Sequence, residues 1–319
     1  MLTRVAIVGA GSVARRHAEV LAGLGNVDVV AVADPVPEAA QKLALDCDAP
    51  WFGSADEALD SVDADAVYIC VPPFAHGPGE DAALSRGLPI FVEKPLAADL
   101  HTAERLAARV ESAGLVTGTG YHWRCMDTMA QARDLLSEAP ALMASGYWLD
   151  KRPPVPWWGR LDRSGGQVVE QLTHVLDVAR VLLGEAVDVS AMGVPSETGD
   201  PGDVDEGTVA TVKFTSGAVA AFTATSLLAA KHRAALHTVS RGLVLEVSEE
   251  SLIVDDGKSR REQYPAEDPR ITVDREFVAA VRGEREGTRA PYADVLRTHR
   301  LACAVAESAA TGRRVTVQP

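Results

Sequence analysis

Residues 5–14 read VAIVGAGSVA, and this stretch decides the fold of the first part of the chain. The run Val5–Val8 is apolar throughout, as in a parallel strand that is buried on both faces. A turn of the pattern G-x-G-x-x-A follows: Gly9 permits a tight turn, Gly11 lets a pyrophosphate approach the backbone, and Ala14 keeps helix and strand close. The pattern predicts a dinucleotide-binding site at the start of the chain.

An acidic residue at the end of the second apolar run strengthens this prediction. Ser12 and Val13 begin the helix after the turn, and the N–H groups of a helix N-terminus suit a phosphate. Asp34 follows 20 residues after Ala14, where a carboxylate accepts hydrogen bonds from the adenine ribose. Because a carboxylate there repels a 2′-phosphate, NAD is favoured over NADP. The alternative interpretation is a turn glycine together with an aspartate that caps the chain before Pro35.

Short apolar runs alternate with helical segments up to about residue 120, which predicts a doubly wound parallel Rossmann sheet, an NAD(P)-binding domain over residues 1–120. Leu100–Ala113 has a helical pattern, with Asp99 placed to cap its start and Gly114 to end it. The predicted strands are Val5–Val8, Val29–Ala33, Ala66–Val71, Ile90–Val92 and Leu115–Thr117.

Residues 121–319 follow a different pattern, in which strands succeed one another without helices between them. This predicts an α+β domain with a largely antiparallel sheet, for substrate binding and oligomerisation. In its first predicted hairpin, Val212, Phe214 and Phe222 share an apolar face. The other face is rich in threonine and suits either solvent or a second subunit. The predicted hairpins are Gly207–Thr215 with Ala218–Ser226, and Gly242–Val247 with Ser251–Asp255, and the threonines are Thr211, Thr223 and Thr225.

The composition is that of a globular protein: 319 residues, 47% hydrophobic and 24% charged. A formal net charge of −14 disfavours nucleic acid and anionic lipid as partners. Four widely spaced cysteines without a C-x-x-C pair indicate reduced thiols and a cytoplasmic location. Apolar stretches fall short of the ~20 residues that span a bilayer, so no membrane segment is predicted. No metal site is predicted either.

Loops that follow the strands of a doubly wound sheet line one crevice. After the predicted strand Ala66–Val71 we expect Pro72 and His76 there, and after Ile90–Val92 the triplet Glu93-Lys94-Pro95; Pro72, His76, Glu93 and Lys94 are assigned to the cofactor. Tyr121 and Arg124 follow the predicted strand Leu115–Thr117 and are assigned to the substrate. Alternatively, His76 only lies at the start of a helix, and Arg124 is a surface charge.

Two features suggest catalysis. Lys94 lies between the end of a predicted strand and a proline, and a lysine is rarely buried unless it has a function. Residues 164–184 predict one long helix on which Glu170, His174 and Asp177 fall within one stripe. Glu170 lies one turn from His174, where a carboxylate tunes the basicity and orientation of an imidazole for general base catalysis. The alternative is a structural histidine satisfied within the core.

The loop at residues 151–160, KRPPVPWWGR, precedes this helix. Trp157 and Trp158 offer flat apolar faces suited to a sugar ring. They would equally serve to anchor the loop to the core. Arg152 and Arg160 suit an anionic substituent or are ordinary surface charges.

The G-x-G-x-x-A turn with His17 in its helix, the triplet at residues 93–95, and the Gly165-Gly166 segment followed by Glu170-x-x-x-His174 resemble one known family. This is the glucose-fructose oxidoreductase, inositol dehydrogenase and rhizopine-catabolism (Gfo/Idh/MocA) family, and the resemblance covers essentially the whole chain. It implies a Rossmann domain that carries NAD(P) and a second domain that contacts substrate and commonly forms the dimer face. A homodimer or homotetramer through the C-terminal sheet is therefore expected.

The resemblance implies that Lys94 is the catalytic lysine, His174 the proton acceptor and Glu170 its helix partner, with Asp177 a substrate-binding carboxylate. The implied activity is hydride transfer between nicotinamide and a secondary alcohol or ketone of a sugar, cyclitol or related polyol. The implied substrate contacts are Lys94, Tyr121, Arg124, Trp158, Glu170, His174 and Asp177.

The chain departs from the family pattern at three positions. Glu170 stands where aspartate is commoner, Leu172 where glycine often sits, and Pro73 where many members have asparagine. These changes reshape the cleft and leave the substrate open. Two other functions stay open as well: a glycosidase that retains its NAD, and a cofactor-binding regulator without catalysis.

Overall fold

The computed structural model describes residues 2–200 and 202–318, which divide into two compact units. The first unit contains the residues up to Ala97, His101–His122 and Pro269–Leu296. The second contains Ala98–Leu100, Trp123–Asp268 and the residues from Arg297 onward. A single boundary at residue 120 therefore misses the return of Pro269–Leu296 to the first unit.

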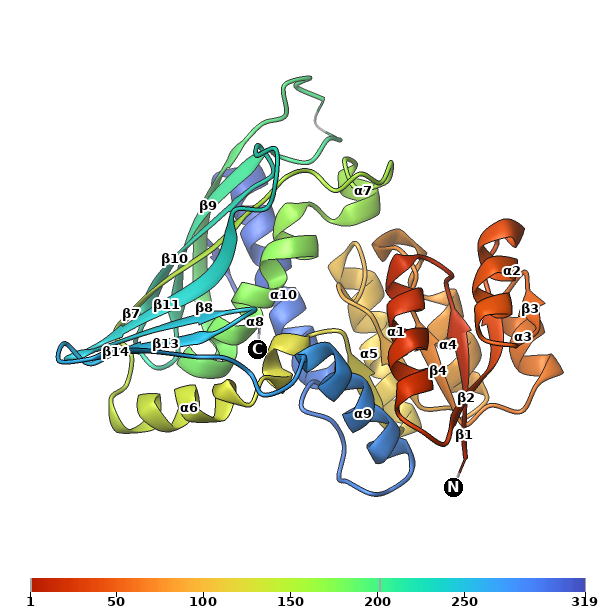
Figure 1. Ribbon diagram of the computed structural model, residues 1–319. Helices are drawn as coiled ribbons and strands as arrows, with labels where there is room; N and C mark the ends of the chain where they lie inside the picture. The colour runs from red at the N-terminus through yellow and green to blue at the C-terminus, as the bar shows by residue number, and fades with distance from the viewer. Residues whose placement is uncertain (1, 201, 319) are drawn as a thin grey trace. The chain divides into compact units, whose positions relative to one another are not determined.

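The first unit is built on a parallel sheet with the strand order β3-β2-β1-β4-β5-β6 (Figure 1), so the predicted Rossmann architecture is confirmed. Strands β4 and β5 are buried along their whole length, as their unbroken apolar runs require. Its strands are β1 Thr3–Val8, β2 Val27–Ala33, β3 Trp51–Phe52, β4 Ala66–Ile69, β5 Ile90–Val92 and β6 Thr117–Thr119. Its helices are α1 Ser12–Gly23, α2 Pro37–Asp46, α3 Ala55–Ser61, α4 Pro78–Ser85, α5 Leu100–Ala113 and α9 Pro269–Val281, with a short 3₁₀ turn η1 Pro73–Ala75.

The second unit is built on a larger sheet with the order β14-β13-β12-β11-β7-β10-β9-β8-β15. Its pairs are antiparallel except β7 with β10, which run parallel. The strands are β7 Met143–Leu149, β8 Ala186–Val194, β9 Gly207–Phe214, β10 Val219–Thr225, β11 Arg233–Ser240, β12 Leu243–Ser248, β13 Leu252–Asp255, β14 Arg260–Gln263 and β15 Val315–Thr316. The helical segments are η2 His122–Cys125, α6 Thr128–Glu138, α7 Leu161–Ser164, η3 Val168–Leu172, α8 Thr173–Leu183 and α10 Tyr292–Thr311, of which α10 belongs to this unit from Arg297 onward.

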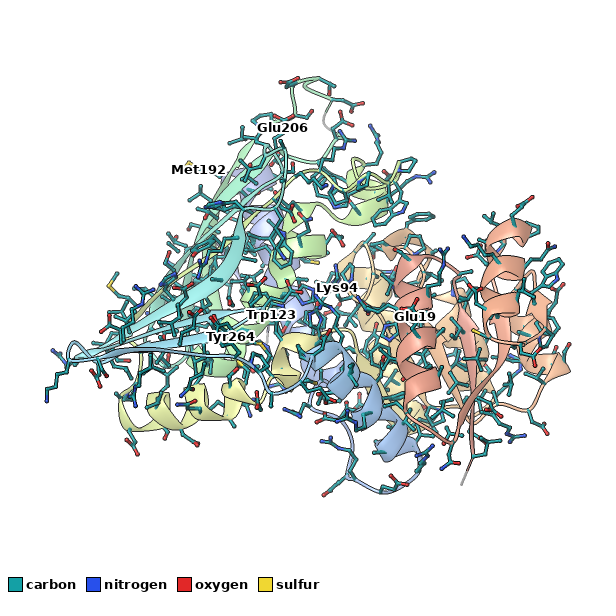
Figure 2. The ribbon with its side chains drawn as sticks, viewed as in Figure 1. Glu19, Lys94, Trp123, Met192, Glu206 and Tyr264 are labelled. Carbon is teal, nitrogen blue, oxygen red and sulfur yellow. The ribbon has the colours of Figure 1, made fainter. Side chains whose placement is uncertain are left out.

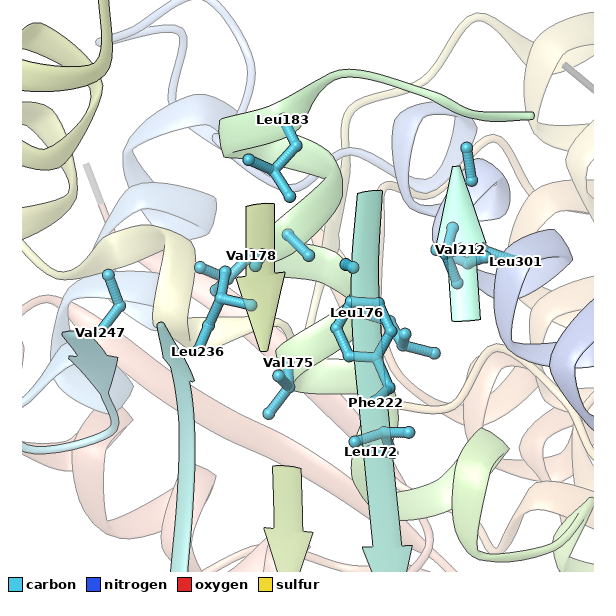
Figure 3. Packing of buried hydrophobic residues seen from close by; sticks show 14 of the residues in the cluster. Leu172, Val175, Leu176, Val178, Leu183, Val212, Phe222, Leu236, Val247 and Leu301 are labelled. Atoms are coloured by element: carbon cyan, nitrogen blue, oxygen red, sulfur yellow. The ribbon is translucent and has the colours of Figure 1, made fainter. Parts of the chain in front are cut away.

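Helices α8 and α10 lie on the same side of this sheet, and their apolar side chains make the core of the unit with it (Figure 1). Figure 3 shows Leu172 and Leu176 close to Phe222 of β10. Both predicted hairpins are present, and Val212, Phe214 and Phe222 are buried as expected. The alternation of buried and exposed residues along β9 and β10 therefore sets which face of the sheet meets the helices.

The opposite face of the sheet carries exposed apolar side chains. Val244, Val239, Met143 and Val219 lie side by side on β12, β11, β7 and β10, and each is between 37% and 57% exposed. Met192 of β8 is 74% exposed, and Figure 2 shows it projecting outward from the sheet. This outer apolar row is more hydrophobic than the predicted threonine face.

Helices of the described chain are too short or too polar to cross a bilayer. Cys47, Cys70, Cys125 and Cys303 form no disulfide bonds with one another.

Candidate active site

The glycine turn of the first unit has the geometry that a phosphate site needs. Gly9 has φ +94°, and a Cβ there would lie 2.5 Å from the carbonyl oxygen of Cys70, so only glycine fits. A Cβ on the exposed Gly11 would meet nothing within 4 Å. Helix α1 starts at Ser12 without a side-chain cap and without an acidic residue in its first turn. Its N-terminal N–H groups therefore face open space that suits an anion.

Asp34 ties this turn to the end of β2. Its Oδ2 accepts the N–H of Ala10 at 2.8 Å, and its Oδ1 accepts the N–H of Val36 at 2.8 Å. Each carboxylate oxygen keeps a second lone pair, and the side chain is partly exposed. The residues present therefore fit a dinucleotide: the glycine turn would hold the pyrophosphate and Asp34 the adenine ribose.

His76 lies just before the start of α4 and four residues after Pro72, which was also predicted to contact the cofactor. Its Nδ1 is 2.6 Å from Oε1 of Glu80, while Oε2 of Glu80 accepts the N–H of Gly77 at 2.7 Å. His76 is 5% exposed, and its buried Nε2 has no hydrogen-bond partner among the described residues. Glu80 thus holds His76 at the start of the helix, and contact of Pro72 and His76 with the cofactor stays a prediction.

Lys94 lies two residues after the end of β5 and is half-buried. The preceding Glu93 is 6% exposed, and its Oε2 accepts the backbone N–H of Lys94 at 2.9 Å. Burial would raise the pKa of the Glu93 carboxyl, but the hydrogen bond and charge of His17, and the charge of Arg16, hold it well below its usual range. Glu93 is thus an ionised carboxylate turned toward these residues.

The predicted long helix is present from Gln167 to Leu183, but it starts later than predicted and its first turn is not a regular α-helix. Gly165 and Gly166 have φ +75° and +89° and separate α7 from the next turn. That turn, η3 Val168–Leu172, is π-helical and leads directly into α8. Glu170 lies in this turn, and π-helical turns occur frequently at functional sites.

His174 is 4% exposed and packs in a cluster of three rings with Trp123 and Trp148. Its ring centroid is 6.1 Å from that of Trp123 at an interplanar angle of 14°, and 5.8 Å from that of Trp148 at 23°, while the two indole centroids are 6.3 Å apart. Both indoles therefore restrict the orientation of the imidazole. Sequence reasoning missed both tryptophans as partners of His174, although Trp123 belongs to the loop that was predicted to reach the crevice.

Trp158 is 2% exposed and donates from Nε1 to Oε2 of Glu170 at 2.9 Å. The indole therefore anchors its loop and orients Glu170. This favours the anchoring interpretation over a flat face offered to a sugar ring.

Asp177 and Arg124 form a buried ion pair. The Nε of Arg124 donates to Oδ2 of Asp177 at 2.7 Å and its Nη2 to Oδ1 at 2.5 Å, and Thr298 donates to Oδ1 at 2.5 Å. Asp177 is 1% exposed, Arg124 5% and Tyr121 0%. Each oxygen of Asp177 thus has a partner within the protein, and direct substrate contacts of Asp177, Arg124 and Tyr121 stay a prediction. Arg124 is also no surface charge.

Comparisons with known proteins agree with these features. Residues 3–121 match the model of the GFO/IDH/MocA oxidoreductase family with an NAD-binding Rossmann fold, and residues 141–244 match the GFO/IDH/MocA C-terminal domain. Together the two matches cover more than half of the chain.

Two relatives are an inositol 2-dehydrogenase of Rhizobium meliloti (28% identical; 64% of this chain and 63% of that protein aligned) and a scyllo-inositol 2-dehydrogenase (NAD(+)) of Bacillus subtilis (28%; 67% and 65%). The chain thus aligns with slightly less than two thirds of the length of these enzymes. A solved levoglucosan dehydrogenase, in complex with NADH and levoglucosan, has the same fold, with a TM-score of 0.90 over 100% of both chains at 21% identity.

Proposed function

Because the chain belongs to the GFO/IDH/MocA oxidoreductase family, whose N-terminal domain is an NAD-binding Rossmann fold, we propose that it transfers a hydride between NAD and a secondary alcohol or ketone of a sugar, cyclitol or related polyol. Relatives named as inositol dehydrogenases support this substrate class. One observation on this chain carries the proposal: a buried imidazole, His174, packs against Trp123 and Trp148 one turn after Glu170.

Each proposed catalytic side chain performs a distinct task. When bound, NAD supplies the hydride acceptor, or in its reduced form the donor. His174 accepts the proton of the substrate hydroxyl as the alcohol is oxidised, and Glu170 tunes its basicity. Lys94 stabilises the negative charge that develops on the same oxygen. Trp158 acts through Glu170, which it orients.

The remaining predicted substrate residues are reassigned in this proposal. Arg124 and Asp177 neutralise one another within the second unit, and Tyr121 is buried in the first. Discrimination among polyols then rests on other side chains, and the specific substrate stays open.

A substrate screen tests the proposal. Sugars, inositols and sugar acids are incubated with NAD and with NADP separately, and the absorbance of the reduced nicotinamide is recorded. His174→Ala should lower kcat by roughly 10² to 10⁴, the usual contribution of general base catalysis. Lys94→Met should lose on the order of 3 kcal/mol of transition-state stabilisation, by analogy with a lost oxyanion donor.

Three results would contradict parts of the proposal. A His174→Ala enzyme with wild-type turnover would reject the base. If Lys94→Met loses cofactor binding while the chemistry survives, Lys94 is a cofactor clamp. Release of an aglycone from a glycoside without net NADH formation would indicate the glycosidase reaction instead.

The outer apolar row supports a homodimer or homotetramer that forms through the second sheet. A contiguous apolar surface of this kind is typical of a subunit interface. Light scattering coupled to size exclusion should give a mass of at least two subunits, and Met143→Lys, within the row, should shift the equilibrium toward one subunit. A single-subunit mass for the unmodified chain would reject this interface. A cytoplasmic location is likewise a proposal, which draws on the four cysteines that form no disulfide bonds with one another.

A further inference from the structure

His17, in helix α1, is bound at both ring nitrogens by carboxylates. Its Nδ1 is 2.8 Å from each oxygen of Asp274, and its Nε2 is 2.9 Å from Oε1 of Glu93. His17 and Asp274 are each 1% exposed. Arg16 adds a second cation, with Nη2 2.9 Å from Oε1 of Glu93. We call these four residues the His17 cluster.

The geometry bears on the protonation state of His17. A neutral imidazole has one N–H donor, whereas an ionised carboxylate only accepts hydrogen bonds. Burial raises the pKa of the Asp274 carboxyl, and the charge and hydrogen bond of His17 oppose that shift. With an ionised carboxylate at each nitrogen, both nitrogens donate and the ring is an imidazolium. Burial alone would lower the pKa of His17, but the charge and hydrogen bonds of Asp274 and Glu93 raise it to about 9.

The His17 cluster is hydrogen-bonded to the backbone of Lys94 through Glu93. Oε1 of Glu93 is bound by His17 and Arg16, which leaves Oε2 to accept the backbone N–H of Lys94. On its other side the carboxylate lies against Gly120, where a Cβ would come within 2.3 Å of Oε2. Glu93 therefore cannot turn without releasing the backbone of Lys94.

Asp274 reaches this cluster from α9, which belongs to the segment Pro269–Leu296 that returns to the first unit. We propose that Asp274 and His17 are positioning residues for Lys94: Asp274 holds the imidazolium, the imidazolium holds Glu93, and Glu93 fixes the backbone from which the lysine projects. The catalytic meaning of this inference rests on the proposed function, but the mechanical link does not.

Exchange of the Lys94 amide tests the link without any substrate. The chain contains six lysines, so ¹⁵N-lysine labelling gives a sparse spectrum in which Lys94→Arg identifies the signal. In Asp274→Asn the amide of Lys94 should exchange about tenfold faster, because the local opening costs less. The matched control is Glu276→Gln, on the same helix: Glu276 is buried and paired with Arg285 and Arg289, so its loss should leave Lys94 unchanged.

Kinetics test the catalytic consequence. In Asp274→Asn we expect kcat for polyol oxidation to fall about 10- to 100-fold, the usual effect of a displaced catalytic group, while NADH still binds with unchanged affinity by fluorescence. In the pH profile of kcat, the alkaline limb should also move to lower pH. The reason is that His17 loses one of its two anionic partners, which lowers its pKa. The other titratable or charged groups close to the cluster are Lys94 after β5 and Tyr68 and Cys70 at β4.

The outcomes distinguish the positioning role of Asp274 from the proposed function. Unchanged Lys94 exchange and an unchanged alkaline limb in Asp274→Asn would overturn the inference. Faster exchange without turnover of any polyol by the wild type would preserve the positioning role and reject the proposed function. If Asp274→Asn does not fold, the wild type decides: as pH rises through 9, exchange at Lys94 must increase relative to the other lysines, and a constant ratio overturns the proposal.

Discussion

Replacing Asp177 with asparagine separates a structural carboxylate from a substrate contact. The side chain is 1% exposed and accepts two hydrogen bonds from Arg124 and one from Thr298, at 2.5 to 2.7 Å. Removing one partner of a buried ion pair leaves the other charge uncompensated, at a cost of about 3–5 kcal/mol. Because asparagine retains one acceptor oxygen, we expect the lower end, about 3 kcal/mol. This is a large fraction of the ~5–15 kcal/mol that stabilises a typical domain.

Urea unfolding followed by tryptophan fluorescence measures this loss, since Trp123, Trp148, Trp157 and Trp158 all belong to the second unit. The double variant Arg124→Met/Asp177→Leu is the control. Replacing a whole buried ion pair by apolar side chains is often neutral, so the double variant should be more stable than Asp177→Asn. An Asp177→Asn protein within about 1 kcal/mol of the wild type, with a raised KM for the polyol, would refute our reasoning and restore Asp177 as a substrate ligand.

Three further predictions concern the first unit. Raising the pH from 6.5 to 9 should lower the free energy of unfolding by about 3 kcal/mol more in the wild type than in His17→Gln, because the native state keeps a proton on His17 that the unfolded chain loses; parallel urea-unfolding curves for the two proteins would contradict this. Gly9→Ala should abolish NADH binding, measured by fluorescence, since its Cβ would collide with the carbonyl of Cys70, and wild-type affinity would show that the turn adapts. Asp34→Ala should weaken NAD binding and reduce the preference over NADP in paired titrations, whereas an unmodified chain that binds NADP more tightly would reject the role of Asp34.

The Rossmann sheet was predictable because its signals are local. Ile90–Val92 and Leu100–Ala113 form the predicted strand and helix with the predicted bounds. The last predicted strand of the first unit was placed at Leu115–Thr117, and strand β6 lies at Thr117–Thr119. Its start depends on its partner, since Thr117 pairs with Ile90 at the beginning of β5. A strand boundary that is set by pairing with a neighbouring strand cannot be predicted from the strand's own residues.

The candidate site was predictable in its reactive groups and less so in their surroundings. The glycine turn, Lys94 and His174 each belong to a recognisable spacing. The tryptophans that hold His174 come from η2 and β7, and only the fold brings them to its ring. The π-helical turn at Glu170 was also missed, because a 3.6-residue periodicity assumes that the helix is regular.

The partners of buried charged residues are hard to predict from sequence patterns because they lie far apart in the chain. Arg124 and Asp177 are 53 positions apart, and His17 and Asp274 are 257 apart. Removing a charge from water is costly unless every polar atom finds a partner, so each buried group tolerates few arrangements of its neighbours. Such a group therefore fixes geometry more strongly than it adds stability. It follows that grafting the glycine turn and the Glu93-Lys94-Pro95 triplet onto another Rossmann sheet, without a carboxylate equivalent to Asp274, would reproduce the motif and leave the lysine backbone unrestrained.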